Sequence, residues 1–254
     1  MRIATFNVNS IRSRMDILKE WLPASGVDAL AVQETKVRDE EFPTAEIEQA
    51  GYSVVYRGEK SYNGVAIISK AAPDEVIHGF TDGLEPLWDT RLIAARFNDI
   101  WLLNTYVPQG KSIEHADYTA KKEFLRRTAA FVEKHIEEKL VWVGDLNVAP
   151  TEIDVTNPSS KKDHVCFVKE LRDLFTELTS PLTDCFRKHH EGERLYSFFD
   201  YRVKNAVDRN IGWRIDHILA TPSLASRCTA CWIDLEPRKR EKPSDHTPML
   251  ADFE

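Results

Sequence analysis

Two spacings of apolar residues alternate along the chain, one typical of helices and one typical of strands. Apolar residues recur every three or four positions over 13–24, 117–138 and 167–179, and this spacing predicts three amphipathic helices. Between these stretches lie short runs rich in β-branched and aliphatic residues, which predict strands. The predicted strands cover 2–9, 28–35, 61–70, 90–97, 99–110, 140–150, 212–220 and 246–253. Strands interleaved with helices in this way favour an α/β fold.

Many of the predicted strands end in, or begin from, a polar side chain. The clearest case is LVWVGDLNVAP at 140–150, where an apolar run leads directly into Asp145 and Asn147. Buried polar groups need partners, because leaving them unpaired costs free energy. Two packed sheets would bring such strand ends together at one edge and so provide the partners. The side chains concerned are Asn7, Glu34, Tyr106, Asp145, Asn147, Asp216, Asp245 and His246.

A cluster of carboxylates and amides with one imidazole has the composition of a magnesium site. Mg²⁺ takes oxygen ligands and keeps bound water, whereas zinc prefers cysteine and histidine. Carboxylates held close together repel one another unless a cation or a proton lies between them. The neutral Asn7 and Asn147 can donate hydrogen bonds to an anionic phosphate, which an aspartate could not. The residue types therefore indicate metal-assisted hydrolysis of a phosphoester.

Each of these residues has a simpler explanation when it is taken alone. Aspartate and asparagine at strand ends commonly form turns by bonding to nearby backbone groups. Asp245 and His246 follow Pro243 and Ser244 and could form such a turn, and Tyr106 could be a core aromatic residue. Turn formation gives no reason for metal ligands and phosphate ligands to occur together, so we favour the site.

The composition is that of one globular domain covering residues 1–254. Hydrophobic residues make up 42% of the chain, enough for a large core, and no Pro- or Gly-rich run marks a linker. The amino terminus lacks the apolar centre of a signal peptide, and the chain has no apolar stretch of about 18 residues. We therefore expect a soluble cytoplasmic protein without a membrane partner.

The four cysteines are at positions 166, 185, 228 and 231. Cys228 and Cys231 form a CxxC motif, but the other two do not supply the second close pair that a zinc site needs. We expect ordinary thiols in a reducing compartment, with a metal or redox site as the alternative.

The net charge is −7, which argues against a protein that coats nucleic acid nonspecifically, because such binding depends on lysine and arginine. Basic residues nevertheless cluster, notably around 202–214 and 238–242, whereas acidic residues crowd 39–48 and 133–138. One face could therefore be positive on an acidic body. The alternative for each cluster is a solvated face without a partner.

Eight short blocks together resemble one protein family. The blocks are IATFNVNSIRSR, LAVQETKV, SYNGVAIISK, TYVPQG, VGDLNVAPTEIDV, YSFFDYR, NIGWRIDHILA and PSDHTPML, and they run in order from residue 3 to residue 250. This pattern is similar to the exonuclease III group of apurinic/apyrimidinic endonucleases, within the endonuclease/exonuclease/phosphatase superfamily. The resemblance implies a deoxyribonuclease I-like fold, a four-layer α/β sandwich of two packed mixed β-sheets flanked by helices.

The resemblance also implies which residues bind the metal ion. Glu34 of the QET block would be the main ligand of a Mg²⁺ ion, for which Mn²⁺ could substitute. Asn7 would lie beside the ion, and Asp245 of the SDH block would be a second ligand.

The remaining strand-end residues would act on the water and the phosphate. By resemblance, Asp145 would orient or deprotonate the attacking water, and Asn147 would help to hold that water and the phosphate. His246, paired with Asp216, would contact a non-bridging phosphate oxygen. Tyr106 would touch the phosphate or the leaving oxygen.

The aromatic and basic residues between 198 and 215 suit contact with nucleic acid. By resemblance, Phe199, Trp213 and Ile215 would line a pocket for the deoxyribose of an abasic site, which costs less to extrude than a paired base. Without the resemblance, this stretch could be a packed hairpin with a charged outer face. Further DNA contacts are expected from Arg12, Asn63, Arg91, Gln109, Lys111 and Arg202.

Two positions depart from part of the family pattern. Gln109 matches the bacterial-type branch, whereas another branch has asparagine there. His164 lies in a loop where smaller or amide residues are common. We hypothesise that His164 narrows the DNA path and favours 3′-end processing over internal incision, with an ordinary loop histidine as the alternative.

The expected activity is Mg²⁺-dependent hydrolysis, by a monomer, of the phosphodiester 5′ to abasic sites in double-stranded DNA. Exonuclease activity in the 3′→5′ direction and 3′-phosphatase or phosphodiesterase activity are expected beside it. An alternative is an enzyme that mainly processes blocked 3′ ends. A phosphatase of inositol phosphates or sphingolipids is less favoured, because the blocks at 196–202 and 210–220 resemble the DNA repair branch. A non-catalytic DNA-binding module is less favoured because Glu34, Asp145, Asn147 and His246 occur together.

Overall fold

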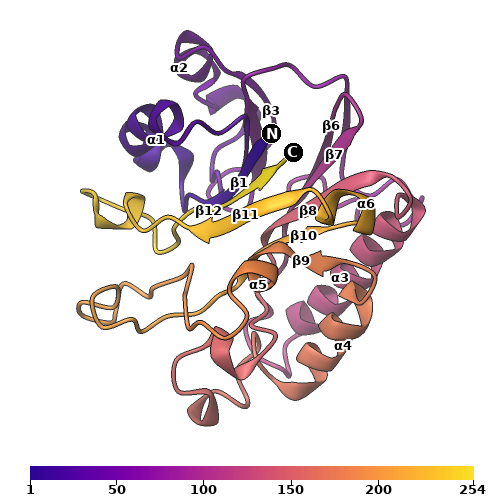
Figure 1. Ribbon diagram of the computed structural model, residues 1–254, viewed down its shortest axis with the longest axis vertical. Coiled ribbons are helices and arrows are strands. Elements are labelled where there is room, and N and C mark those ends of the chain that lie inside the picture. Colours follow the sequence, from indigo (N-terminus) through magenta and orange to yellow (C-terminus); the bar gives the residue numbers. More distant parts are fainter.

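The computed structural model describes residues 1–254 and contains two six-stranded β-sheets packed face to face (Figure 1). The first sheet has the order β11-β12-β1-β2-β4-β3 and comprises β1 (Arg2–Asn7), β2 (Ala29–Gln33), β3 (Ser53–Arg57), β4 (Val65–Ser69), β11 (Cys228–Ile233) and β12 (Met249–Phe253). The second has the order β5-β6-β7-β8-β10-β9 and comprises β5 (Glu75–His78), β6 (Leu92–Phe97), β7 (Ile100–Tyr106), β8 (Lys139–Asp145), β9 (Thr183–Asp184) and β10 (Asp216–Ala220). Both sheets are mixed, since β1–β2 and β7–β8 pair in parallel and the other pairs are antiparallel.

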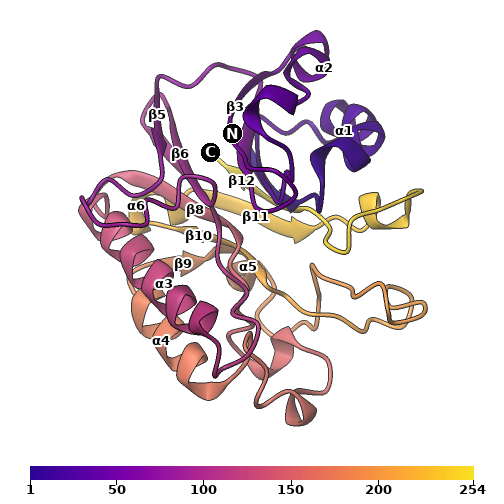
Figure 2. The ribbon, with the colours of Figure 1, turned by 180° about the vertical axis from the view of Figure 1, so that it is seen from behind.

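Helices cover the outer face of each sheet, so the molecule has four layers (Figures 1 and 2). Three separate apolar clusters fill the spaces between the layers: one between the sheets, one under the helices of the first sheet and one under those of the second. The predicted four-layer sandwich is confirmed. The helices are α1 (Ile11–Ser25) and α2 (Thr44–Gln49) on the first sheet, α3 (Ala116–Lys134) and α4 (Lys169–Thr179) on the second, and the short α5 (Cys185–His189) and α6 (Pro222–Ala225). Single 3₁₀ turns occur at Asp39–Glu41, Glu152–Asp154, Pro158–Ser160 and Pro237–Lys239.

Four strands were not predicted, namely β3, β5, β9 and β11. All four lie at sheet edges, where only one neighbour pairs with the strand. Edge strands are short and partly exposed, so their apolar pattern is weak. Several predicted strands are also shorter than expected: the run 140–150 leaves the sheet after Asp145, and 212–220 joins it only at Asp216. The residues that follow Asp145 and those that precede Asp216 lie outside the sheet, so their polar side chains can contribute to a site.

The pairing of the strands places their polar ends next to one another. Tyr106 pairs with Asp145 across the parallel β7–β8 ladder, and Asp145 pairs with Asp216 across β8–β10. Asn7 ends β1 beside the end of β2, which leads directly into Glu34. Gly144 makes the close approach of β7 and β8 possible, because a Cβ at this position would lie 1.9 Å from the Thr105 carbonyl oxygen.

Several long connections extend from this same edge of the sandwich. The segments 191–212 and 234–245 project side by side beyond the ends of the strands in both views (Figures 1 and 2). None of the helices combines the length and the apolar composition that a membrane-spanning segment needs. All four cysteines are buried free thiols, and Cys185, Cys228 and Cys231 belong to the core between the sheets.

Candidate active site

A cavity of about 480 Å³ opens at the edge where the polar strand ends meet. One side of it is formed by strand-end residues of both sheets, and the other by residues of the loops that follow β8 and precede β10. The lining includes Glu34, Tyr106, Asp145, Asn147, Asp245 and His246 from the predicted site, together with Gln109, Arg202, Trp213, Ile215 and His164.

Asn7 joins the carboxylates of the two sheets. Its Nδ2 donates to Glu34 Oε1 at 2.8 Å and to Asp145 Oδ2 at 2.9 Å. Both Asn7 and Asp145 are almost fully buried, so these bonds form in a medium of low dielectric constant. A single amide therefore fixes the distance between a carboxylate of the first sheet and one of the second.

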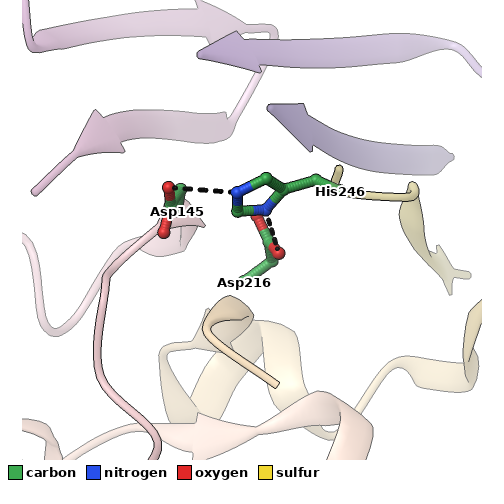
Figure 3. Close-up of side chains that lie close together, drawn as sticks. All are labelled: Asp145, Asp216 and His246. Atoms are coloured by element: carbon green, nitrogen blue, oxygen red, sulfur yellow. Dashed lines mark hydrogen bonds and ion pairs between the residues drawn. The ribbon is translucent and has the colours of Figure 1, made fainter. Parts of the chain in front are cut away.

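His246 lies between two aspartates (Figure 3). Its Nδ1 is 2.8 Å from Asp216 Oδ2, and its Nε2 is 3.7 Å from Asp145 Oδ2. Burial on its own would lower the pKa of His246, but the two carboxylates outweigh burial and raise it to about 10. The imidazolium form, with both nitrogens protonated, is therefore the stable form in the site.

Asp145 lies at the centre of the negative charges. Burial raises the pKa of Asp145 to about 7; His246 opposes this shift, and the carboxylates of Asp216 and Glu34 add to it. Each oxygen of Asp145 accepts a hydrogen bond, Oδ1 from the backbone N–H of Asn147 at 3.1 Å and Oδ2 from Asn7. The carboxylate is thus held in one orientation and poised to accept a proton near neutral pH.

Tyr106 is a neutral donor on the wall of the cavity. Burial, together with the negative charges of Glu34 and Asp145, raises the pKa of its phenol well above the usual value. The Arg91 guanidinium lies 4.6 Å from the centre of the Tyr106 ring and donates to the Tyr106 carbonyl at 3.1 Å. Arg91 therefore contacts both the ring and the carbonyl of Tyr106, and the predicted contact of Arg91 with DNA stays a prediction.

The donor atoms around Glu34 fit a hard cation. Glu34 and Asp245 offer carboxylate oxygens, the ligand type that Mg²⁺ takes, and Asn7 lies beside Glu34 with its Nδ2 on Glu34 Oε1. In addition, Asp216 Oδ1 is buried without any hydrogen-bond partner. Asp145, Asp216 and His246 also have ligand atoms within 4.8 Å of one another, but both nitrogens of His246 already face carboxylates. The Glu34 side of the cluster is therefore the better position for a metal.

Sequence reasoning missed two residues beside Glu34. Lys36 Nζ lies 2.7 Å from Glu34 Oε2 and also bonds to Asn9 Oδ1. Asn9 Nδ2 in turn donates to Asp245 Oδ1 at 3.0 Å. The chain Glu34–Lys36–Asn9–Asp245 links the two carboxylates expected to bind metal. The sequence did offer one signal for these two residues. Asn9 lies two residues after Asn7, and Lys36 lies two residues after Glu34, and both Asn7 and Glu34 were predicted site residues.

The prediction that Phe199 lines the pocket is wrong. Phe199 is 1% exposed and packs against Tyr196 and Ala206, whereas its neighbour Phe198 lines the cavity together with Trp213 and Ile215. The two phenylalanines point to opposite sides because successive side chains of an extended segment alternate. Residue order alone could not decide which of the two faces inward.

The residues expected to contact DNA divide into two groups. Gln109 and Arg202 line the cavity, and Arg202 Nη2 lies 2.6 Å from Asp200 Oδ2. The other four are outside the lining. Arg91 contacts Tyr106, and the remaining three bond to nearby acidic side chains: Arg12 to Glu41, Asn63 to Glu59 and Lys111 to Asp117. Lys161 also lines the cavity and was not predicted.

Known proteins are similar to this chain over most or all of its length. The model of the endonuclease/exonuclease/phosphatase family matches residues 4–246. The exodeoxyribonuclease III of Haemophilus influenzae is 34% identical over 268 residues, covering 100% of both chains. The chain belongs to the endonuclease/exonuclease/phosphatase family. Its full-length similarity to exodeoxyribonuclease III identifies this family member as a hydrolytic DNA repair nuclease.

Solved structures are similar to this chain in both fold and sequence. An AP endonuclease from Archaeoglobus fulgidus superposes with a TM-score of 0.97 at 46% identity, covering 100% of this chain and 99% of that one. A 3′ phosphatase from Neisseria bound to a product DNA hairpin superposes with a TM-score of 0.94 at 34% identity, with the same coverage. This chain is thus similar over its full length to two structures that are named for different activities.

Proposed function

We propose that this nuclease hydrolyses the phosphodiester bond 5′ to abasic sites in double-stranded DNA, with 3′→5′ exonuclease and 3′-end processing as further activities. The observation that carries the proposal is the convergence of Glu34, Asp145 and His246 at the edge of one cavity.

The side chains around Asp145 match the needs of phosphodiester hydrolysis. The His246 imidazolium would donate a hydrogen bond to a non-bridging phosphate oxygen, where negative charge increases during the reaction. Asp145, with its pKa near 7, would orient the attacking water and accept its proton. Asn147 and the neutral Tyr106 would donate hydrogen bonds to the phosphate oxygens.

The proposed cofactor is Mg²⁺, with Mn²⁺ as a substitute. Glu34 and Asp245 would hold the ion with their carboxylates. Asn7 would lie beside the ion and orient Glu34, because its Nδ2 donates to Glu34 Oε1. Bound there, the ion would neutralise charge on the phosphate. Lys36 bonds to Glu34 and Asn9, so its ammonium carries a positive charge next to the same carboxylate.

The cavity wall suits a sugar that carries no base. Phe198, Trp213 and Ile215 form an apolar side, and Lys161 and Arg202 add positive charge for the phosphates. A deoxyribose without its base would fill this side with little desolvation of polar groups. Because an abasic nucleotide neither stacks nor pairs, its extrusion costs less than the few kcal/mol of an intact nucleotide.

A second candidate function is an enzyme that acts mainly on blocked 3′ ends. His164 favours it, because the His164 ring lies 4.6 Å from the Trp213 ring and fills part of the cavity wall. Burial and the charges of Lys121 and Lys161 lower the pKa of His164 to about 4, so the ring is neutral and packs as an aromatic group. Such a ring would obstruct a DNA strand that continues past the cavity more than it would obstruct the 3′ end of a DNA strand.

Two duplexes distinguish these functions, one with an internal abasic analogue and one with a 3′-phosphate at a nick. Each is incubated with Mg²⁺ and with EDTA, and initial rates are compared. We expect Mg²⁺-dependent cleavage of both, with the abasic duplex cleaved faster. Faster release of the 3′-phosphate would favour the second candidate, and binding without cleavage in Mg²⁺ would refute both.

A further inference from the structure

Lys121 is a buried lysine that the proposed chemistry does not use. It lies on α3 and has no exposed surface. Its Nζ donates to three backbone carbonyls, those of Gln109 at 3.0 Å, Asn147 at 2.7 Å and Val165 at 2.8 Å. Burying an ammonium group costs free energy, and the three hydrogen bonds to carbonyls offset that cost by using all three N–H donors.

The three carbonyls belong to three different segments of the cavity wall. Gln109 lies in the loop after β7, Asn147 follows β8, and Val165 lies between His164 and Cys166 in the loop before α4. Gln109, Asn147, His164 and Cys166 all line the cavity. One ammonium group therefore fixes these segments relative to one another and to α3.

The bond to Asn147 acts on a residue with a left-handed backbone. Asn147 has a φ of 52°, a region that asparagine adopts more readily than most other residues with a side chain. Its backbone N–H donates to Asp145, its Nδ2 donates to the Val107 carbonyl at 3.0 Å, and its own carbonyl accepts from Lys121. These bonds together hold the side chain of Asn147 in one orientation next to Asp145.

Lys121 also places a positive charge beneath the site. No carboxylate forms an ion pair with it, and burial lowers its pKa. The Cys166 sulfur lies 3.8 Å from Nζ, and the charges of Cys166 and Asp145 partly oppose the lowering of the Lys121 pKa by burial. Together with burial, the positive charge of Lys121 lowers the pKa of His164 on the cavity wall. The ammonium therefore acts on the site through bonds to the backbone and through its electric field.

We propose that Lys121 is a positioning residue for phosphodiester hydrolysis: it holds the segments of Gln109, Asn147 and Val165 in the geometry that presents Asn147 to the phosphate. This proposal rests on the proposed roles of Asp145 and Asn147. A residue that only stabilises the fold would change the unfolding temperature without changing the rate of the folded enzyme. A positioning residue lowers kcat in enzyme that remains folded.

The test compares three variants under steady-state conditions with the abasic duplex. Lys121→Met keeps the aliphatic stem and removes the donors and the charge, and Lys121→Gln restores amide donors without charge. Lys122→Met is the matched control, because Lys122 is the next residue on α3, lies outside the cavity lining and pairs with the exposed Glu170, 2.7 Å away. Thermal unfolding shows for each variant whether the enzyme is folded at the assay temperature.

We expect Lys121→Met to lower kcat by about 10- to 100-fold with KM for DNA changed by less than about threefold, since small misplacements of catalytic groups have effects of this size. Lys121→Gln should recover part of kcat, and Lys122→Met should match the unaltered enzyme. A folded Lys121→Met enzyme with unchanged kcat would overturn the proposal. So would failure of both Lys121 variants to fold, because Lys121 would then be needed for stability alone.

Asp145→Asn separates this inference from the proposed function. If Asp145→Asn loses cleavage and Lys121→Met does not, the site is correct and the role of Lys121 is wrong. If Asp145→Asn cleaves normally, the proposed function itself fails, whatever the Lys121 variants do.

Discussion

At the scale of single residues, burial and neighbouring charges decide which proton each group carries. Two aspartates keep His246 charged, burial and two nearby carboxylates keep Tyr106 neutral, and burial brings the pKa of Asp145 to about 7. The shifted pKa values therefore make Asp145 a proton acceptor and His246 a fixed cation. Separated protonation states of this kind are typical of sites that perform acid–base chemistry.

Asp145→Asn should lower the single-turnover rate on the abasic duplex by at least about 100-fold, the usual cost of losing one catalytic group of this kind. DNA binding should be retained, because the substitution removes a negative charge close to the phosphate. Rates are measured by rapid quench and affinities by fluorescence anisotropy. A rate within threefold or so of the unaltered enzyme would remove Asp145 from the chemistry.

His164→Ala should raise the ratio of abasic-site incision to 3′-phosphate release, because it removes the ring that packs against Trp213 and narrows the wall. His189→Ala is the control, since His189 is exposed on α5 and outside the cavity. The two rates are measured on the same preparation. An unchanged ratio would make His164 an ordinary loop residue.

At the scale of secondary-structure elements, strand register builds the site. Parallel pairing of β7 with β8 and antiparallel pairing of β8 with β10 align Tyr106, Asp145 and Asp216. Strong apolar runs followed by polar residues made these strand ends predictable from the sequence. The edge strands could not be predicted, because their apolar pattern is weak. Which of Phe198 and Phe199 faces the cavity could not be predicted either, because that depends on which face of the extended segment points inward.

Lys121 shows a further limit of sequence reasoning. It lies three residues after Tyr118 and three before Phe124, on the face of α3 that packs against the sheet. A lysine at an apolar position of a helix was therefore a signal that the sequence contained. Its three carbonyl partners come from distant segments, however, and only the folded chain reveals them.

A buried ion-pair network supports the loop before β10. Arg214 Nε lies 2.6 Å from Asp154 Oδ1, its Nη1 lies 2.8 Å from Asp184 Oδ2, and Arg187 also bonds to Asp154. Burial opposes ionisation, but Arg214 and Arg187 outweigh it and hold the pKa of Asp154 well below its usual range. Since Arg214 lies between Trp213 and Ile215, this network holds the wall of the cavity.

The network predicts how stability depends on pH. Because the pKa of Asp154 is lower in the folded state than in the unfolded state, its contribution is complete above about pH 4 and is lost as the pH falls below that value. Asp154→Asn should therefore destabilise the protein by about 3–5 kcal/mol at pH 7 and reduce the loss of stability between about pH 4 and pH 2. Urea unfolding measures both, with the exposed Asp163→Asn as control. Parallel pH curves for Asp154→Asn and the unaltered protein would contradict the assignment.

At the scale of the whole molecule, an acidic protein has to bind an acidic polymer. The net charge of −7 makes nonspecific attraction weak, so binding depends on the basic residues around the cavity. Lys161 and Arg202 are two of these on the lining. DNA affinity should therefore fall steeply with salt.

Arg202→Gln should reduce the slope of log affinity against log salt by about 1, as expected for loss of one phosphate contact. Arg96→Gln is the control, because Arg96 pairs with Glu75 and lies outside the cavity. Anisotropy titrations over a range of salt concentrations give both slopes. Equal slopes for the two variants would show that Arg202 does not contact phosphate.

The central claim is that residues from separate strands gather around one divalent ion and one scissile phosphate. The most direct test is the Mg²⁺ dependence of single-turnover cleavage of the abasic duplex by the unaltered enzyme and by Glu34→Gln. We predict no cleavage in EDTA, saturable recovery with Mg²⁺, and a half-saturating Mg²⁺ concentration at least about 10-fold higher for Glu34→Gln, since loss of a ligand weakens the site. Cleavage that persists in EDTA, or the same Mg²⁺ dependence in both proteins, would contradict the claim.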